Sequence, residues 1–165
     1  MKSKLIYIIF LALPSLVVAQ NFELIKPDVE VLKSQLINTN FAEDGVYLYL
    51  IENYKVESEK LEIEIYEYPD YSICGFKQDF QFGIRYSQSQ CIEGGGMTSK
   101  LTLPKTTKTT AIQWIELISK VYENNNLQVW NKNKTSYVPS NGGAGCYYQL
   151  KENLTLTEIE IYCGC

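Results

Sequence analysis

The 165-residue sequence contains no histidine. Histidine is the usual general base near neutral pH, so its absence excludes a Ser-His-Asp triad and a Cys-His catalytic pair. It also excludes the zinc sites that need an imidazole ligand. A cysteine nucleophile would need another activator, such as a lysine or a helix N-terminus. The sequence shows no catalytic motif or cofactor fingerprint either, so we predict a non-catalytic protein without a cofactor or a bound metal.

Basic residues are also scarce, and arginine occurs only once, at position 85. Asp and Glu together number 19 against 15 Lys and Arg, which gives a formal net charge of −4 at pH 7. No basic stripe is present to neutralise phosphates, so we expect no nucleic-acid partner. The acidic balance also argues against binding to anionic lipid.

Only one long apolar run exists, over residues 5–18, and it follows Lys2 and Lys4. This pattern predicts a signal peptide over residues 1–19, with cleavage after Ala19. A membrane anchor is the alternative, but the run is short and no stop-transfer charges follow it. No cysteine lies at the cleavage point, which argues against a lipid anchor. We therefore predict one secreted or periplasmic domain over residues 20–165, with a formal net charge of −6 once both lysines are removed.

The sequence has five cysteines, an odd number. Secreted proteins meet an oxidising environment, so disulfide bonds are expected. One thiol is then left free or pairs between molecules. We favour one bridge between Cys74 and Cys91, and a second from Cys146 to either Cys163 or Cys165. The alternative is a copper or zinc site formed by Cys146, Cys163 and Cys165, which an oxidising compartment disfavours.

Two segments have helical periodicity. Residues 110–122 have an apolar face and a polar face with a period near 3.6, which predicts the main helix. Thr110 and Gln113 suggest a capping box at its start, and the Asn run at 124–126 suggests its end. Residues 28–37 predict a shorter N-terminal helix, because Pro27 and Asp28 favour a helix start.

The remaining segments predict strands, so the expected fold class is α+β. We expect an antiparallel sheet of about five to seven strands with helix 110–122 packed on one face. A phase slip near Thr157 and Glu158 suggests a β-bulge. Residues 87–96 and 131–145 predict loops. The expected strands cover residues 45–51, 61–66, 80–86, 97–103, 146–151 and 155–163, and residues 71–77 and 127–130 are candidates for further short strands.

Three patterns suggest chemistry but have simpler explanations. Glu62 with Glu64, and Glu158 with Glu160, suggest a glycosidase pair or a calcium site. Facing carboxylates or a ligand loop are not encoded by Glu-x-Glu on a strand, so a solvated strand face is favoured. The glycines at 94–96 precede a strand rather than a helix, which does not fit a phosphate loop.

Aromatic residues near the expected loop 131–145 are the best binding candidates. The sequence has 13 tyrosines, and tyrosine and tryptophan contribute strongly to interfaces and to sugar stacking. Filling of half-buried strand positions is the alternative role. The candidate binding residues are Trp130, Tyr137, Asn141, Tyr147 and Tyr148.

These observations favour a binding protein, such as an inhibitor or an immunity-type module, that recognises another protein. A long loop between stapled strands would place the contact residues, and an acidic surface would speed association with a basic enzyme. The alternative is a carbohydrate-binding or carbohydrate-active protein that uses Glu, Tyr and Trp side chains.

Overall fold

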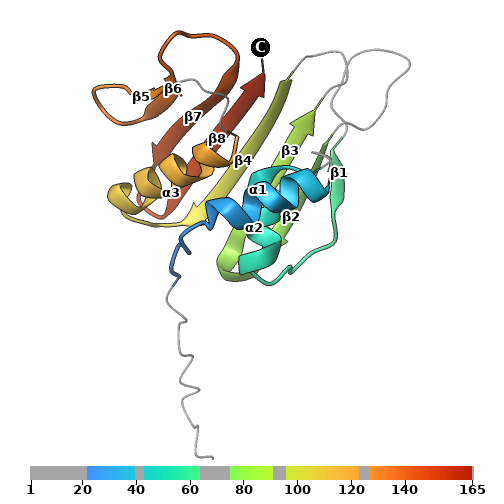
Figure 1. Cartoon of the computed structure of the whole chain (residues 1–165). Helices are drawn as coiled ribbons and strands as arrows, with labels where there is room; N and C mark the ends of the chain where they lie inside the picture. The colour runs from blue at the N-terminus through green and yellow to red at the C-terminus, as the bar shows by residue number, and fades with distance from the viewer. Residues whose placement is uncertain (1–21, 40–42, 64–74, 91–95, 123–126, 165) are drawn as a thin grey trace, which may run out of the picture.

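A computed structural model describes residues 22–39, 43–63, 75–90, 96–122 and 127–164. The protein has the expected α+β class: one eight-stranded antiparallel sheet and three helices, which lie on the same face of the sheet (Figure 1). Over the described residues, no helix combines the length and the apolar character needed to cross a bilayer. In chain order the elements are α1 (Val29–Asn38), α2 (Gly45–Asn53), β1 (Leu61–Ile63), β2 (Gly75–Phe80), β3 (Ile84–Gln90), β4 (Gly96–Pro104), α3 (Lys108–Val121), β5 (Gln128–Trp130), β6 (Ser136–Pro139), β7 (Gly145–Glu152) and β8 (Leu156–Gly164).

The sheet consists of two halves with the same strand connectivity, although the sequence shows no repeat. The strand order is β1-β2-β3-β4-β8-β7-β6-β5, so each half is a four-stranded meander preceded by helix. The halves meet where β4 pairs with β8, from Gly96 opposite Gly164 to Pro104 opposite Leu156. The last strand of each half therefore lies at the centre of the sheet.

The hydrophobic core lies between the helices and one face of the sheet. Strand side chains alternate between faces, so Leu101 and Ile159, which are opposite each other in β4 and β8, both point into it. The helix predicted over residues 110–122 is confirmed, and its Trp114, Ile115 and Ile118 are almost completely buried. Burial of this apolar stripe is the main source of stability for such a helix.

Both predicted helices have side-chain caps at their N-termini. The α3 helix begins two residues earlier than expected, because the Thr107 hydroxyl accepts a hydrogen bond from the Thr110 amide at 3.2 Å. The predicted capping box at Thr110 and Gln113 is therefore wrong. In α1, the Asp28 carboxylate accepts from the amides of Glu30 and Val31, which confirms the predicted start.

Residues 45–51 form helix α2, and their prediction as a strand is wrong. Every residue from Gly45 to Leu50 is buried. A helix that is buried on all sides has no polar stripe, so its sequence resembles that of a central strand. Here α2 contacts both α1 and α3, and tertiary packing determines its conformation.

Residues 80–86 contain a turn between two strands, where a single strand was expected. The 3₁₀ turn Gln81–Gly83 joins β2 to β3, and Phe82 has a φ of 66°. A bulky residue rarely takes positive φ, so composition did not indicate a turn. The Phe82 ring packs against Phe22 and Tyr54 at centroid distances of 6.0 and 6.4 Å. The expected loop at 87–96 likewise begins as strand, since β3 extends to Gln90.

The expected irregular loop at 131–145 contains strand β6 and two tight turns, so that prediction is also wrong. In the first turn the Asn131 side chain accepts hydrogen bonds from the amides of Thr135 and Ser136. The predicted β7–β8 hairpin is confirmed. No bulge occurs at Thr157, because its pairing with both neighbouring strands is continuous and its side chain faces the core.

Candidate binding surface

The face of the sheet opposite the helices is the candidate surface, and we call it the open face (Figure 1). Among the described residues, no helix covers it. Strand alternation and register place polar, charged and tyrosine side chains on it. They are Lys77, Asp79, Arg85, Ser87, Ser89, Thr98, Lys100, Tyr147, Gln149, Lys151, Glu158, Glu160 and Tyr162.

Two tyrosines form an ordered pair on this face, which we call the tyrosine platform. Tyr147 and Tyr162 are opposite each other in β7 and β8, and their ring centroids are 6.2 Å apart. A Cβ atom on Gly96 would lie only 2.7 Å from Tyr162 Cε2. The Tyr162 ring therefore lies directly over β4, in space that only a glycine leaves open.

The turn between β6 and β7 fixes the other ring. The Tyr147 hydroxyl donates a hydrogen bond to the Gly143 carbonyl at 2.7 Å. The Asn141 side chain accepts from the Gly143 amide at 3.1 Å. Two of the predicted binding residues, Asn141 and Tyr147, are thus brought together at one corner of the open face.

Sequence reasoning did not identify Tyr162 as part of this site. Its pairing with Tyr147 depends on the register of β7 and β8, which is set by the turn at Asn153. The Asn153 side chain accepts hydrogen bonds from the amides of Thr155 and Leu156. The Asn-Leu-Thr sequence was thus the available signal, because Asn commonly stabilises a turn in this way.

The other predicted aromatics lie on the helix side of the sheet. Trp130 stacks on Tyr137 with centroids 4.8 Å apart, and its Nε1 donates to Glu116 Oε1 at 2.9 Å. Tyr148 is fully buried beneath Tyr137. These three residues attach α3 to β5, β6 and β7, and they are separated from the tyrosine platform by the sheet.

The second Glu pair is engaged in ion pairs on the open face. Lys100 lies 3.2 Å from Glu158, and Lys151 lies 2.8 Å from Glu160. The hydrogen bond from Lys151 lowers the pKa of Glu160, and the same bond raises the pKa of Lys151. A glycosidase needs one carboxyl with a raised pKa, and the ion pair shifts the pKa of Glu160 in the opposite direction. Of the first pair, Glu64 lies outside the described residues.

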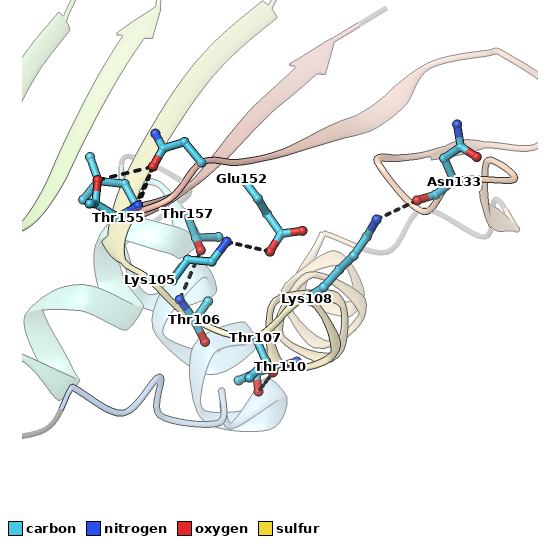
Figure 2. Close-up of polar contacts among 11 residues, drawn as sticks. Lys105, Thr106, Thr107, Lys108, Thr110, Asn133, Glu152, Thr155 and Thr157 are labelled. Carbon is cyan, nitrogen blue, oxygen red and sulfur yellow. Dashed lines mark hydrogen bonds and ion pairs between the residues drawn. The ribbon is translucent and has the colours of Figure 1, made fainter.

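The Lys- and Thr-rich segment between β4 and α3 holds two turns in place (Figure 2). Lys105 pairs with Glu152 at 3.1 Å, next to the β7–β8 turn. Lys108 donates to the Asn133 carbonyl at 2.8 Å, in the β5–β6 turn. Both lysines are therefore used in structural contacts at the start of α3.

A buried carboxylate, Asp44, lies between α2, α3 and the sheet. It is only 3% exposed and accepts hydrogen bonds from Tyr86 at 2.6 Å, from Ser99 at 3.0 Å and from Tyr122. Burial, followed by the charge of Asp44, raises the pKa of Tyr86 and of Tyr122. Three hydroxyl donors satisfy a buried charge, and solvent does not reach it, so we assign Asp44 a structural role.

A cleft of about 380 Å³ lies between residues 24–27 and α3. Trp114 and Leu117 contribute to its wall, and Lys26 and Lys120 also line it. Its one carboxylate, Glu116, is already hydrogen-bonded to Trp130. The cleft therefore lacks the pair of carboxylates that glycoside hydrolysis uses.

One disulfide bond joins Cys146 to Cys163, as one of the predicted pairings states. These residues are opposite each other and are adjacent in the chain to Tyr147 and Tyr162, so the bridge lies on the core side of the sheet, behind the tyrosine platform. Such a bond is typical of proteins that fold in an oxidising compartment. It also removes two of the three thiolates of the metal alternative, and the described residues contain no cluster of three potential metal ligands. The predicted Cys74–Cys91 pair and Cys165 lie outside the described residues.

Comparison with known proteins gives no family model, curated protein or solved structure that matches this chain. The functional conclusion therefore depends on the geometry of the open face.

Proposed function

We propose that this protein is a non-catalytic, secreted or periplasmic binding protein that recognises a partner protein through the open face of its sheet. An inhibitor or an immunity-type module is the kind of binding protein we propose. The observation that carries the proposal is the tyrosine platform, whose two rings are held before any partner arrives. Rings that are already ordered lose little entropy on binding, and exposed tyrosines are frequent energetic centres of interfaces.

The surroundings of the platform support a protein ligand. Ser87, Thr98 and Gln149 provide adaptable hydrogen bonds on the same face, and tyrosine combined with small polar residues is the composition of antibody-type binding surfaces. Eight strands at about 4.8 Å spacing make a sheet about 34 Å wide. This width accommodates the ~800 Å² per partner that a stable interface needs.

The test uses two matched double variants of the protein. In the first, Tyr147 and Tyr162 are both changed to Ala, which removes the platform. In the second, Gln113 and Lys120 on the outer side of α3 are changed to Ala; both are exposed. Immobilised wild type and both variants are exposed to the secreted proteins of the source organism, and retained proteins are quantified by mass spectrometry.

We expect a partner that wild type and the α3 variant retain equally and that the platform variant loses. A protein retained by the platform variant but lost by the α3 variant would contradict the proposal. Circular dichroism confirms that each variant is folded. Point variants are needed because deletion of residues 131–145 would remove β6 from the sheet.

Carbohydrate binding is the second candidate, because tyrosine rings also stack on sugars. In that case a glycan array would give signals that the platform variant loses, and no protein would be retained. Turnover of a glycan that stops in a Glu158→Gln or Glu160→Gln variant would contradict the non-catalytic assignment.

A further inference from the structure

We infer that the partner is a protein that presents an acidic patch to Lys77 and Arg85, while its hydrogen-bonding or aromatic groups meet the tyrosine platform. This inference rests on the proposed function and adds the chemistry of the partner. It also reverses the expectation, drawn from net charge, that the partner is basic.

The charge of the open face differs in sign from that of the whole chain. The chain has a formal net charge of −4. The charged residues on the described open face comprise four cations and three anions, a formal charge of +1. They are Lys77, Arg85, Lys100 and Lys151 against Asp79, Glu158 and Glu160.

Two of these cations are already paired and two are available. Lys100 and Lys151 bind Glu158 and Glu160. Lys77 and Arg85 are exposed, and within the described part of the chain neither has a carboxylate within 4.0 Å.

The positions of Lys77 and Arg85 make them one site. Arg85 is opposite Asp79, and Lys77 is two residues before Asp79 on the same face, so the two cations are diagonal neighbours. Diagonal neighbours on adjacent strands are within reach of long side chains. Arg85 is the only arginine of the chain, and a guanidinium binds a carboxylate through two parallel hydrogen bonds.

The site and the tyrosine platform fit beneath one partner. The path from β3 to β7 crosses β4 and β8, which is three strand spacings or about 14 Å. Arg85 is opposite Thr102 and Tyr162 is opposite Thr98, which adds four residues or about 13 Å along β4, so the two ends are about 20 Å apart. Between them lie Thr98 and Lys100, so polar groups connect the two ends. A globular protein covers both ends at once, and Tyr-, Ser- and Thr-rich surfaces are typical of protein recognition.

The experiment compares two charge reversals of equal size. Lys77→Glu with Arg85→Glu changes the open face, and Lys26→Glu with Lys120→Glu changes exposed residues on the helix side by the same amount. The partner that wild type retains and the platform variant loses is purified, and its Kd is measured at low and at physiological salt. Circular dichroism and urea unfolding show that both variants are folded.

We expect the open-face reversal to weaken binding about 100-fold or more, because the new glutamates would face the acidic patch and like charges across an interface are costly. The helix-side reversal should leave Kd within about threefold, since long-range effects of exposed charges are screened by salt. Wild-type binding should weaken with added salt.

Other outcomes separate this inference from the proposed function. If the platform variant loses the partner but the open-face reversal binds as tightly as wild type, the acidic-patch inference is wrong and the proposed function stands. If no protein depends on the platform, both are wrong. Alginate, a polyuronate, tests the alternative of an acidic polysaccharide. If no protein is retained, and alginate binds wild type but neither the platform variant nor the open-face reversal, the partner is an acidic polysaccharide and not a protein.

Discussion

Single hydroxyl groups connect the elements of this protein. The Thr157 hydroxyl, in β8, accepts a hydrogen bond from the Thr106 amide at 3.2 Å (Figure 2). This contact fixes the segment that leads from the sheet into α3. Thr157 is completely buried, so water cannot replace the bond.

A change of Thr157 to Val keeps the shape of the side chain and removes its hydroxyl. The Thr106 amide then loses its partner, and we expect the free energy of unfolding to fall by about 1–3 kcal/mol. Urea unfolding measures this loss. Thr155→Val is the control: Thr155 is exposed, and we expect the change to cost less than about 1 kcal/mol.

A change of Gly96 to Ala tests the tyrosine platform without removing an aromatic ring. The new methyl group would meet Tyr162 Cε2 at 2.7 Å, so the ring must move. We expect about a tenfold loss of partner binding with little loss of stability, because Tyr162 is 39% exposed and the methyl group displaces its ring toward solvent and not into the core. Nuclear Overhauser contacts between the Tyr162 ring and β4 report its position; their persistence with unchanged binding would show that Gly96 has no such role.

At the scale of elements, α3 packs the helix layer against the sheet. Its inner side carries Ile118, which is completely buried, and its outer side carries the exposed Lys120. Ile118→Ala should lower the free energy of unfolding by about 2–5 kcal/mol, since it leaves a cavity in the core. Lys120→Ala should change it by less than about 0.5 kcal/mol. Equal effects in urea unfolding would mean that α3 does not depend on its buried face.

The bridge between Cys146 and Cys163 joins β7 to β8, and the two cysteines are 17 positions apart in the sequence. Closure of a loop of this size stabilises a protein by about 3 kcal/mol in chain-entropy estimates. Replacing both cysteines by Ala should lower the free energy of unfolding by about that amount. Mass analysis of unreduced peptides checks the pairing, and a Cys146–Cys165 peptide would contradict it.

At the scale of the whole molecule, buried tyrosines set the response to alkaline pH. Burial raises the pKa of Tyr49, Tyr86, Tyr122 and Tyr148 above the usual value, and the charge of Asp44 raises the last three further. The unfolded chain releases these protons near pH 10, and the folded chain keeps them. The contribution of these tyrosines to the free energy of unfolding is therefore fully present below about pH 10. Above that pH it falls by about 1.4 kcal/mol per pH unit for each tyrosine.

We expect one cooperative alkaline transition above about pH 10, in which tyrosinate absorbance at 295 nm and loss of circular dichroism coincide. Tyr148→Phe is a suitable comparison, because the buried Tyr148 hydroxyl has no hydrogen-bond partner within the described structure. The variant removes one ionising group at little cost, so its midpoint should move to higher pH. Ionisation of all tyrosines before unfolding would contradict this prediction.

The sequence by itself determined the parts whose stability is local. Helices α1 and α3 were predictable because each has an amphipathic stripe, and β4, β7 and β8 because their faces alternate between core and solvent. The Cys146–Cys163 pair was predictable as one of two alternatives. Asn141 and Tyr147 could be chosen as candidate binding residues because they lie in or beside the turn-rich segment 131–145.

Only the tertiary structure decided the rest, because the deciding contacts join residues far apart in the sequence. The α2 segment is apolar on all sides, and its packing between the sheet and the other helices selects the helical form. The Phe82 turn depends on contacts with Phe22 and Tyr54. Tyr147 meets Tyr162, and Tyr162 lies over Gly96, only because β8 pairs with both β7 and β4 in one register. The turn at Asn153 sets the register of β7 and β8, but no local signal pairs β8 with β4, so the open face and its charge were visible only in the folded chain.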